Sequence, residues 1–311
     1  MKKIEVSFIT INYNSSQHTA ELINSILSNT DSISYEIIVV DNASEDKDFL
    51  SLKEFLKDKN DVKLIRNSIN SGFSSGNMLG VNHASGQYYF FVNNDCKLLN
   101  NTAGVLKKYL DSNAEVALAT AQIVDANNNY SSSHKQFPHL LKQLFGNSVQ
   151  RKFSKVKFPS NRVKLDKPTQ VEVVSGSCMF FNADAFCDIG GFDTAFFLYC
   201  EEEDIAKRIW ESDRKVFFIP EAQIFHEAGG STEQGFLMQQ EFYISYYHLL
   251  NKHYNRTGRI LLKIALFFKL FFRMFKKKMG VRMFLSMLSG FPQKNSLRYS
   301  QKIKKHHEEV V

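Results

Sequence analysis

The chain has 311 residues and a mass of 35.8 kDa, and 43% of its residues are hydrophobic, 23% charged and 13% aromatic. This length suffices for one large core, and the composition excludes a disordered, collagen-like or disulfide-stapled chain. The formal charge is +7, but residues 251–311 carry 15 Lys and Arg against two acidic residues, which leaves a net charge of −6 in residues 1–250. Such a split is typical of an acidic globular body with a basic appendage that binds an anionic partner.

The N-terminal residues predict a strand and not a secretory leader, because their short apolar run is interrupted by polar residues. No stretch reaches the roughly 20 uninterrupted apolar residues of a spanning helix. The nearest one, Ile260–Phe275, contains three basic residues. We therefore expect a cytoplasmic protein. The cysteines form no CxxC and no Cys/His zinc pattern, and we expect reduced core thiols at Cys96, Cys178, Cys187 and Cys200.

The first half of the chain alternates β-branched or aromatic runs with helical patterns. This alternation predicts a mostly parallel sheet covered by helices, with ligands bound at the carboxyl ends of the strands. Residues 130–170 read as a long connection or lid, and the chain becomes helical after Gly235. Strands are predicted at 4–11, 35–40, 62–65, 88–92 and 216–219, and helices at 18–28, 46–57, after 72 and at 202–212. Ordered structure resumes at 171–181 and is followed by a short helix.

Polar residues follow two of the predicted strands. Asp41 comes directly after the run at 35–40, and Asn93, Asn94 and Asp95 come directly after the run at 88–92. These positions lie on the ligand-binding edge of a parallel sheet. Either aspartate alone is equally consistent with a helix N-cap or a turn residue.

The segment Asn70–Gly80 is rich in small residues and leads into a helix. Small residues at a helix N-terminus let backbone N–H groups approach a phosphate or a sugar. The segment is not a GxxxxGK[ST] loop, and no GxGxxG follows the first strand. ATPase and dinucleotide-binding functions are therefore excluded.

An acidic run, Glu201–Asp204, opens a predicted helix. One interpretation is a charge cluster that the helix dipole favours. The aromatic segment before it, Gly190–Tyr199, instead predicts buried carboxylates with a functional role. His226 follows a strand predicted to end at Pro220. A single histidine is more often structural, but this one could complete a metal site with Asp95.

Together these segments resemble the family 2 inverting glycosyltransferases of the GT-A fold, and among them the rhamnosyltransferase-like members. The resemblance implies an α/β nucleotide-diphospho-sugar transferase fold over residues 1–250, with a basic, Phe-rich helical extension over 251–311. The matching stretches occur in family order; they are Ile11–Asn14, Val40–Ser44, Asn70–Gly80, Asn93–Asp95, Gly176–Ser177, Gly190–Asp193, Tyr199–Arg208 and His226–Ser231.

The resemblance also implies residue roles. Asp41 would pair with the pyrimidine ring of a nucleotide-sugar, and the glycine-spaced loop would pack on the ribose and the donor sugar. The implied donor-binding residues are Asn12, Asn14, Asp41, Gly72, Phe73, Gly76, Asn77 and Asn94.

Asp95 matches the last acid of the family's metal-binding DxD, which is thinned here to Asn-Asn-Asp, and His226 matches a later metal-site histidine. Both would hold Mg²⁺ or Mn²⁺, which neutralises the diphosphate leaving group. Glu202 occupies the position of the family's catalytic base, which deprotonates the acceptor hydroxyl on the opposite face of the sugar. Glu201 is the alternative base.

The basic tail predicts an amphipathic helix over about 259–278. Its basic residues cluster on one half of a helical wheel, with phenylalanines opposite. We favour an anionic membrane surface as its partner. The second interpretation is that the helix packs on the globular body or in an oligomer. Nucleic acid is the least favoured partner because the aromatic residues do not form a platform for base stacking.

These observations lead to one main functional hypothesis and two alternatives. The main one is a metal-dependent transferase that moves a sugar, best matched by L-rhamnose from dTDP-L-rhamnose, to a glycan or polyprenyl-diphosphate-linked acceptor of cell-surface polysaccharide. It would act at the inner face of the cell membrane. The alternatives are a transferase that uses a UDP-hexose or UDP-N-acetylhexosamine and a catalytically silent nucleotide-sugar-binding subunit.

Overall fold

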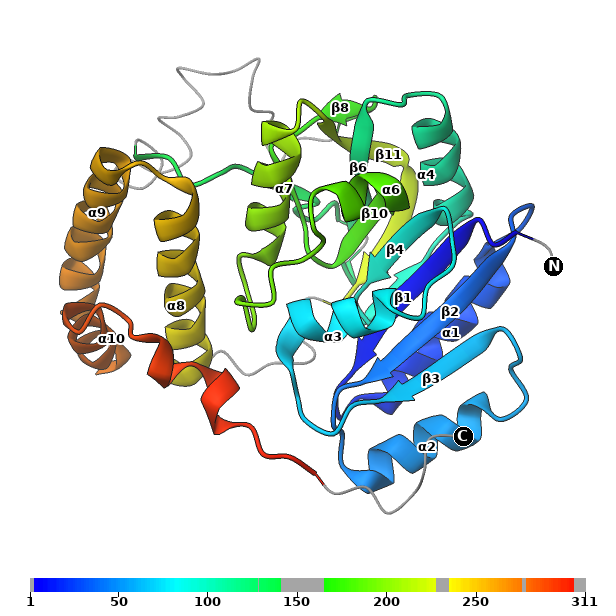
Figure 1. The fold of residues 1–311 in the computed structure, drawn as a ribbon, viewed down its shortest axis with the longest axis horizontal. Coiled ribbons are helices and arrows are strands. Elements are labelled where there is room, and N and C mark those ends of the chain that lie inside the picture. The colour runs from blue at the N-terminus through cyan, green and yellow to red at the C-terminus, as the bar shows by residue number, and fades with distance from the viewer. Residues whose placement is uncertain (1–2, 128, 141–164, 228–234, 276–277, 305–311) are drawn as a thin grey trace.

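The computed structural model describes residues 3–127, 129–140, 165–227, 235–275 and 278–304 (Figure 1). A nine-stranded mixed sheet forms the centre, in the order β3-β2-β1-β4-β10-β6-β11-β5, and β8 pairs with β11. A two-stranded sheet joins β7 and β9. The strands are β1 Val6–Asn12, β2 Tyr35–Asp41, β3 Val62–Arg66, β4 Tyr88–Val92, β5 Cys96–Leu98, β6 Val116–Val124, β7 His134–Lys135, β8 Thr169–Gln170, β9 Val173–Val174, β10 Cys178–Asn182 and β11 Lys215–His226.

Helices cover both faces of the sheet, as the alternating pattern predicted. One core cluster joins α1, α2 and α4 to the sheet, and a second joins α3, α6 and α7 to its other face. The helices are α1 Ser16–Asn29, α2 Asp46–Leu56, α3 Gly72–Val81, α4 Thr102–Asp111, α6 Ala183–Asp188, α7 Glu201–Glu211, α8 Phe236–His253, α9 Arg256–Met274 and α10 Lys278–Leu288, followed by the 3₁₀ turns η1 Gln293–Asn295 and η2 Leu297–Ser300.

Strand directions follow the prediction in the first half of the chain. The β3-β2-β1-β4 pairs are all parallel, and the buried runs of β1, β2 and β4 are typical of a sheet covered on both faces. Antiparallel pairs then enter, because β10 lies between β4 and β6 and β5 pairs with the end of β11. The sheet is therefore mostly parallel but mixed.

The last strand differs from its prediction in a way that shapes the site. β11 does not stop at Pro220 but continues to His226, with a register shift against β6 between Ile219 and Gln223. Proline cannot donate to a strand ladder, so it is tolerated at such an irregularity. The extension pairs His226 with Cys96 of β5, which places the histidine next to Asp95.

Helices α8, α9 and α10, which from here on are called the helical extension, form a third core that packs on Phe196 and Cys200 (Figure 1). After Leu288 the described residues contain only the two 3₁₀ turns and the non-helical residues 301–304, so the helix expected after Gly235 does not continue through all of this region. Cys187 is exposed, which corrects the expectation of a core thiol, whereas the other three cysteines are buried and all four are free. Among the described helices, none combines the length and apolar character needed to span a bilayer.

Candidate active site

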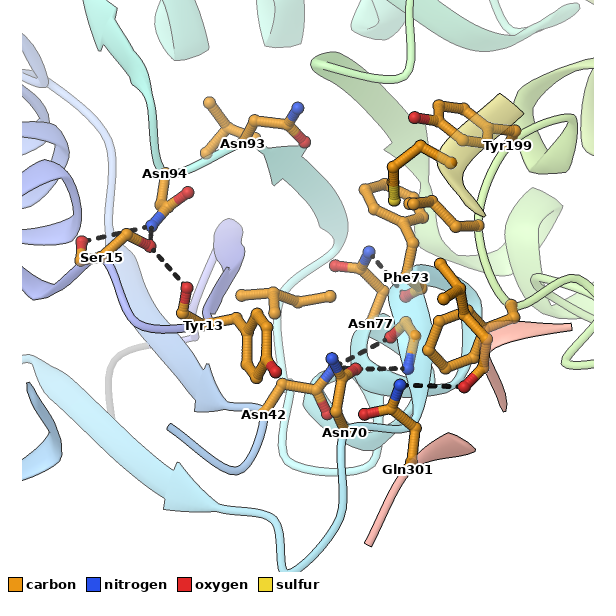
Figure 2. Close-up of a pocket in the computed structure, with 17 residues that line it drawn as sticks. Tyr13, Ser15, Asn42, Asn70, Phe73, Asn77, Asn93, Asn94, Tyr199 and Gln301 are labelled. Atoms are coloured by element: carbon orange, nitrogen blue, oxygen red, sulfur yellow. Dashed lines mark hydrogen bonds between the residues drawn. The ribbon is translucent and has the colours of Figure 1, made fainter. Parts of the chain in front are cut away.

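A cavity of about 500 Å³ opens beyond the carboxyl ends of β1 and β4. Figure 2 shows Tyr13 and Asn94 on one side of it, Phe73 and Tyr199 on the other, and Gln301 from the C-terminal segment at its edge. The wall is mainly apolar and aromatic, with a few amide side chains. This lining is typical of a pocket that binds a ring system and its polar substituents.

Asn12 and Asp41 lie beneath the cavity and not in its wall. Both are fully buried, and the Nδ2 of Asn12 donates to Asp41 Oδ1 at 2.9 Å and to Asp48 Oδ2 at 2.8 Å. Asp41 Oδ2 accepts the backbone N–H of Ser44 at 3.2 Å. Arg66 Nε lies 3.8 Å from the same carboxylate oxygen. This network fixes the two strand ends relative to each other.

Asn14 holds the loop that carries Tyr13. Its φ of +52° is in the left-handed region, which asparagine tolerates better than most residues. Its Oδ1 accepts the backbone N–H of Glu45 at 2.7 Å, and its own N–H donates to Ser44 Oγ at 2.9 Å. Asn14 itself is absent from the cavity wall, so its neighbour Tyr13 is the residue presented to a ligand.

The glycine-spaced loop supports the cavity at the start of α3. Gly72 has a φ of +81°, and a Cβ there would lie 2.2 Å from the carbonyl oxygen of Phe197, so no other residue fits. Phe73 N–H donates to that same oxygen at 2.7 Å. Gly72, Phe73 and Asn77 line the cavity. Gly76 instead packs against Ile11, where a Cβ would lie 2.8 Å from Cδ1.

Asn94 and Asp95 face different surroundings although they are neighbours. Asn94 lines the cavity and its Nδ2 donates to Ser15 Oγ at 2.6 Å. Asp95 is buried and its Oδ1 lies 3.3 Å from His226 Nε2. Among the described residues this oxygen has no hydrogen-bond partner. A buried carboxylate oxygen and an imidazole nitrogen that are close without a hydrogen bond fit the binding of a divalent cation.

Cys96 completes a group of three potential metal ligands with Asp95 and His226, whose ligand atoms lie within 4.8 Å of one another. Its thiol is directed to the carbonyl of Ser177, with the sulfur 3.6 Å from that oxygen. Burial raises the pKa of the Cys96 thiol well above its usual value. Oxygen-preferring Mg²⁺ and Mn²⁺ are therefore better matched by Asp95 and His226.

The acidic run at the start of α7 is buried, as predicted. A cation from another segment of the chain, which the sequence did not indicate, pairs with it. Lys135 Nζ lies 2.5 Å from Glu202 Oε1 and 2.7 Å from Glu203 Oε1. Within the described residues, the buried Oε2 atoms of Glu201, Glu202 and Glu203 lack hydrogen-bond partners. Lys135 belongs to a two-residue strand in the segment interpreted as a connection, where no pattern marked it.

The loop before β10 connects this acidic cluster to the strand-end residues. Gly176 borders the carboxyl group of Glu202, because a Cβ there would lie 3.6 Å from its Cδ. The carbonyl of the next residue, Ser177, accepts the backbone N–H of Asn93 at 3.0 Å. Tyr199 and Cys200 both have positive φ just before α7, a strained conformation that is common at functional sites.

Sequence patterns also did not indicate the C-terminal strap, which we define as residues 292–304. Leu297 and Gln301 of this strap line the cavity (Figure 2). Leu297 N–H donates to buried Glu241 of α8 at 2.7 Å. At the far end, Lys304 N–H donates to the Ser68 carbonyl at 2.7 Å. The strap therefore connects the helical extension to the loop after β3.

Family models match most of this architecture. "Glycosyl transferase family 2" matches residues 7–190, and "Glycosyl transferase family group 2" matches residues 103–295. The chain belongs to glycosyl transferase family 2. Members of this family are inverting hexosyltransferases, and this family 2 enzyme is accordingly a glycosyltransferase.

Individual relatives agree with this assignment. The enzyme is 27% identical over 209 residues to rhamnosyltransferase WbbL of Escherichia coli K12, which covers 64% of the chain and 75% of WbbL. It is 34% identical over 59 residues, or 19% of each chain, to the Mycobacterium tuberculosis N-acetylglucosaminyl-diphospho-decaprenol L-rhamnosyltransferase. Among solved structures, GalNAc-T7 with UDP, GalNAc and Mn²⁺ matches with a TM-score of 0.58 at 16% identity, over 78% of this chain and 48% of that one. This likeness confirms the GT-A fold.

Proposed function

We propose that this family 2 enzyme transfers L-rhamnose from dTDP-L-rhamnose to a glycan or polyprenyl-diphosphate-linked acceptor in cell-surface polysaccharide synthesis. One observation carries the proposal: a donor-sized cavity is lined by Asn93 and Asn94, at the strand end that a single loop joins to the buried acidic start of α7. The identity to WbbL supports rhamnose, and the name of the mycobacterial relative supports a lipid-linked acceptor. Such an acceptor would place the enzyme at the inner face of the cell membrane.

The donor would occupy the cavity. Its nucleotide would lie against Tyr13, Asn42 and the glycine-spaced loop, above the network of Asn12 and Asp41. Asp95 and His226 fit a Mg²⁺ or Mn²⁺ ion, which would neutralise charge on the diphosphate leaving group. GalNAc-T7, a structural neighbour, was solved with Mn²⁺.

Charge in the acidic cluster favours Glu202 over Glu201 as the base. Burial, followed by the neighbouring charge of Glu202, raises the pKa of Glu201 well above its usual value, so forming the Glu201 carboxylate costs more than it would in solvent. Glu202 has the Lys135 ammonium at 2.5 Å, and its other oxygen is free of hydrogen bonds to described residues. That oxygen is buried and lies outside the cavity wall, and the proposal is that it receives the acceptor hydroxyl once the acceptor is bound.

The test is hydrolysis and transfer with a panel of dTDP- and UDP-sugars, with Mn²⁺ and with EDTA. We expect release of dTDP from dTDP-L-rhamnose that needs the metal, is abolished in Asp95→Ala and falls at least about a hundredfold in Glu202→Gln. The matched control is Glu201→Gln, which should retain most of the activity.

Other outcomes identify the alternatives. If only a UDP-hexose or UDP-N-acetylhexosamine is turned over, that nucleotide-sugar is the donor in place of dTDP-L-rhamnose. Full activity in Glu202→Gln with loss in Glu201→Gln would identify Glu201 as the base. Binding of nucleotide-sugars without turnover on any lipid-linked acceptor would favour a silent binding subunit.

A further inference from the structure

The surface of α9 carries an apolar stripe that the fold does not use. Ile264, Phe268 and Phe272 are 48%, 50% and 61% exposed, and Phe275 just beyond the helix is 71% exposed. Ile260 continues the same line toward the helix start and is 47% exposed. These positions recur every three to four residues, so they form one face of the helix.

A different face of α9 attaches the helix to the protein. Leu262, Ala265, Leu266 and Leu270 are buried in the core shared with α8 and α10. The helical wheel predicts one apolar side opposite the basic residues, whereas the helix is apolar on both its inner and its outer side. Core packing therefore does not account for the outer stripe.

The next helix extends this apolar surface. In α10, Val281, Leu285 and Leu288 are 44%, 58% and 60% exposed and fall on one helical face. Phe284 of α10 contacts Phe267 and Phe271 of α9, which ties the two helices together. Figure 1 places both helices at the end of the molecule opposite the N-terminus. Exposed apolar residues gathered on two packed helices in this way are typical of an interaction site.

The positive charge around the apolar stripe distinguishes between two kinds of partner, a second copy of the chain and an anionic lipid surface. No Asp or Glu occurs between Glu241 and Glu308. Arg256, Lys269 and Arg282 are exposed on the same two helices. A second copy of the chain would bring the same excess of positive charge to the interface and would be repelled, whereas an anionic lipid surface is complementary to it.

We propose that the outer face of α9 and α10 docks onto a bilayer that contains anionic lipids, with the phenylalanines inserted among the acyl chains and the basic residues at the headgroups. The helices lie in the interface plane, which agrees with the absence of a spanning helix among the described residues. Docking depends neither on the donor sugar nor on catalysis. It would bring α8, whose Met238 lines the cavity, close to the lipid surface.

The test is cosedimentation of the full chain with lipid vesicles. We expect binding to mixed phosphatidylcholine–phosphatidylglycerol vesicles, at least about tenfold weaker binding to pure phosphatidylcholine, and a decline with added salt. Phe268→Ser/Phe272→Ser should weaken binding at least about tenfold, because two inserted rings are lost. Lys269→Glu/Arg282→Glu should weaken binding to anionic vesicles only.

The matched control is Leu50→Ser, which changes a residue of α2 that is 49% exposed. Circular dichroism and nucleotide-sugar turnover in solution should be unchanged in all variants, because the substituted side chains are exposed and lie outside the cavity wall. Wild-type protein that stays in the supernatant with anionic vesicles would overturn the proposal. So would a stable dimer that the Phe268→Ser/Phe272→Ser variant dissociates.

Discussion

Lys135 brings a positive charge to a site crowded with carboxylates. Burial, followed by the charge of Glu202, raises the pKa of Glu203 to about 6, and Lys135 opposes this rise. The ammonium group thus limits the mutual repulsion of the acidic side chains. Removing it should make negative charge in the whole cluster more costly.

We predict that Lys135→Met moves the acid limb of the pH–rate profile to higher pH by about one unit. The base works in its ionised form, which exists above its pKa, so a raised pKa removes activity from the acidic side. Activity should recover toward high pH, and Lys135→Arg should retain the wild-type profile. The measurement is kcat/KM between pH 5 and 9 for each variant. A uniform loss of kcat/KM at every pH would contradict this role for Lys135.

Gly72 combines backbone conformation and close packing at one position. We predict that Gly72→Ala lowers the free energy of unfolding by more than about 2 kcal/mol and weakens donor binding, because the added methyl group meets the Phe197 carbonyl. Gly290 has a similar φ of +77° but nothing within 4 Å of an added Cβ. Gly290→Ala should therefore cost only about 1 kcal/mol in urea unfolding. Equal losses in the two variants would show that packing at Gly72 is unimportant.

At the scale of elements, strands with a strong local sequence pattern were predicted, and strands with a weak pattern were missed. The runs at 35–40 and 88–92 are dense in β-branched and aromatic residues, and the structure confirms both as strands. β6 was not predicted, because its sequence mixes apolar residues with Ala, Thr and Gln and shows no clean period. β7 and β5 are too short to leave a pattern.

The same limit applies to the candidate site. Strand ends marked Asp41 and Asp95 as candidates, and the spacing of small residues before a helix marked the loop Asn70–Gly80. The contact of Asp95 with His226 depends on pairing of β5 with β11, which are more than a hundred residues apart, and no local signal encodes that pairing. Lys135 and Gln301 enter through similarly long-range contacts.

The C-terminal strap gives a prediction at this scale. Gln301→Ala should raise the KM for the donor about three- to tenfold with little change in kcat, because it removes a polar group from the cavity wall and leaves the acidic cluster intact. Tyr299→Ala, in the same strap but 66% exposed and outside the wall, is the control. Calorimetric binding of dTDP should show the same difference. Unchanged binding in Gln301→Ala would mean that the strap only borders the site.

At the scale of the whole molecule, one ionic cluster joins helix α7 to the helical extension. Asp204 is fully buried, and its Oδ1 lies 2.7 Å from both His253 Nε2 and Lys252 Nζ of α8. Its Oδ2 accepts from Arg208 Nη2 at 2.6 Å. Burial alone would raise the pKa of Asp204, but the hydrogen bond from His253 and the cationic neighbours lower it to about 2.

The lowered pKa of Asp204 predicts that the attachment of α8 to α7 depends on pH. Because the pKa is depressed in the folded state, the ionised Asp204 contributes about 2 kcal/mol above pH 4, and this is lost as the pH falls toward 2. Asp204→Asn should lower the urea unfolding free energy by about this amount at pH 7, and the difference should close in acid. Asp188→Asn, which breaks an exposed pair with Arg214, should change stability by less than about 0.5 kcal/mol. A difference that is independent of pH would refute the assignment.

Because β11 has an irregularity at Pro220, the side to which His226 points depends on the number of residues that follow the irregularity. Successive residues of a strand point to opposite faces, so inserting one residue between Gln223 and His226 would turn the imidazole away from Asp95. Inserting two would restore the face but carry the ring about 7 Å along the strand. Substitutions along this stretch should therefore be tolerated far better than single-residue insertions or deletions. In a length-variation series of β11, insertions of one and of two residues should both abolish metal-dependent turnover, the first by turning the imidazole away and the second by displacing it.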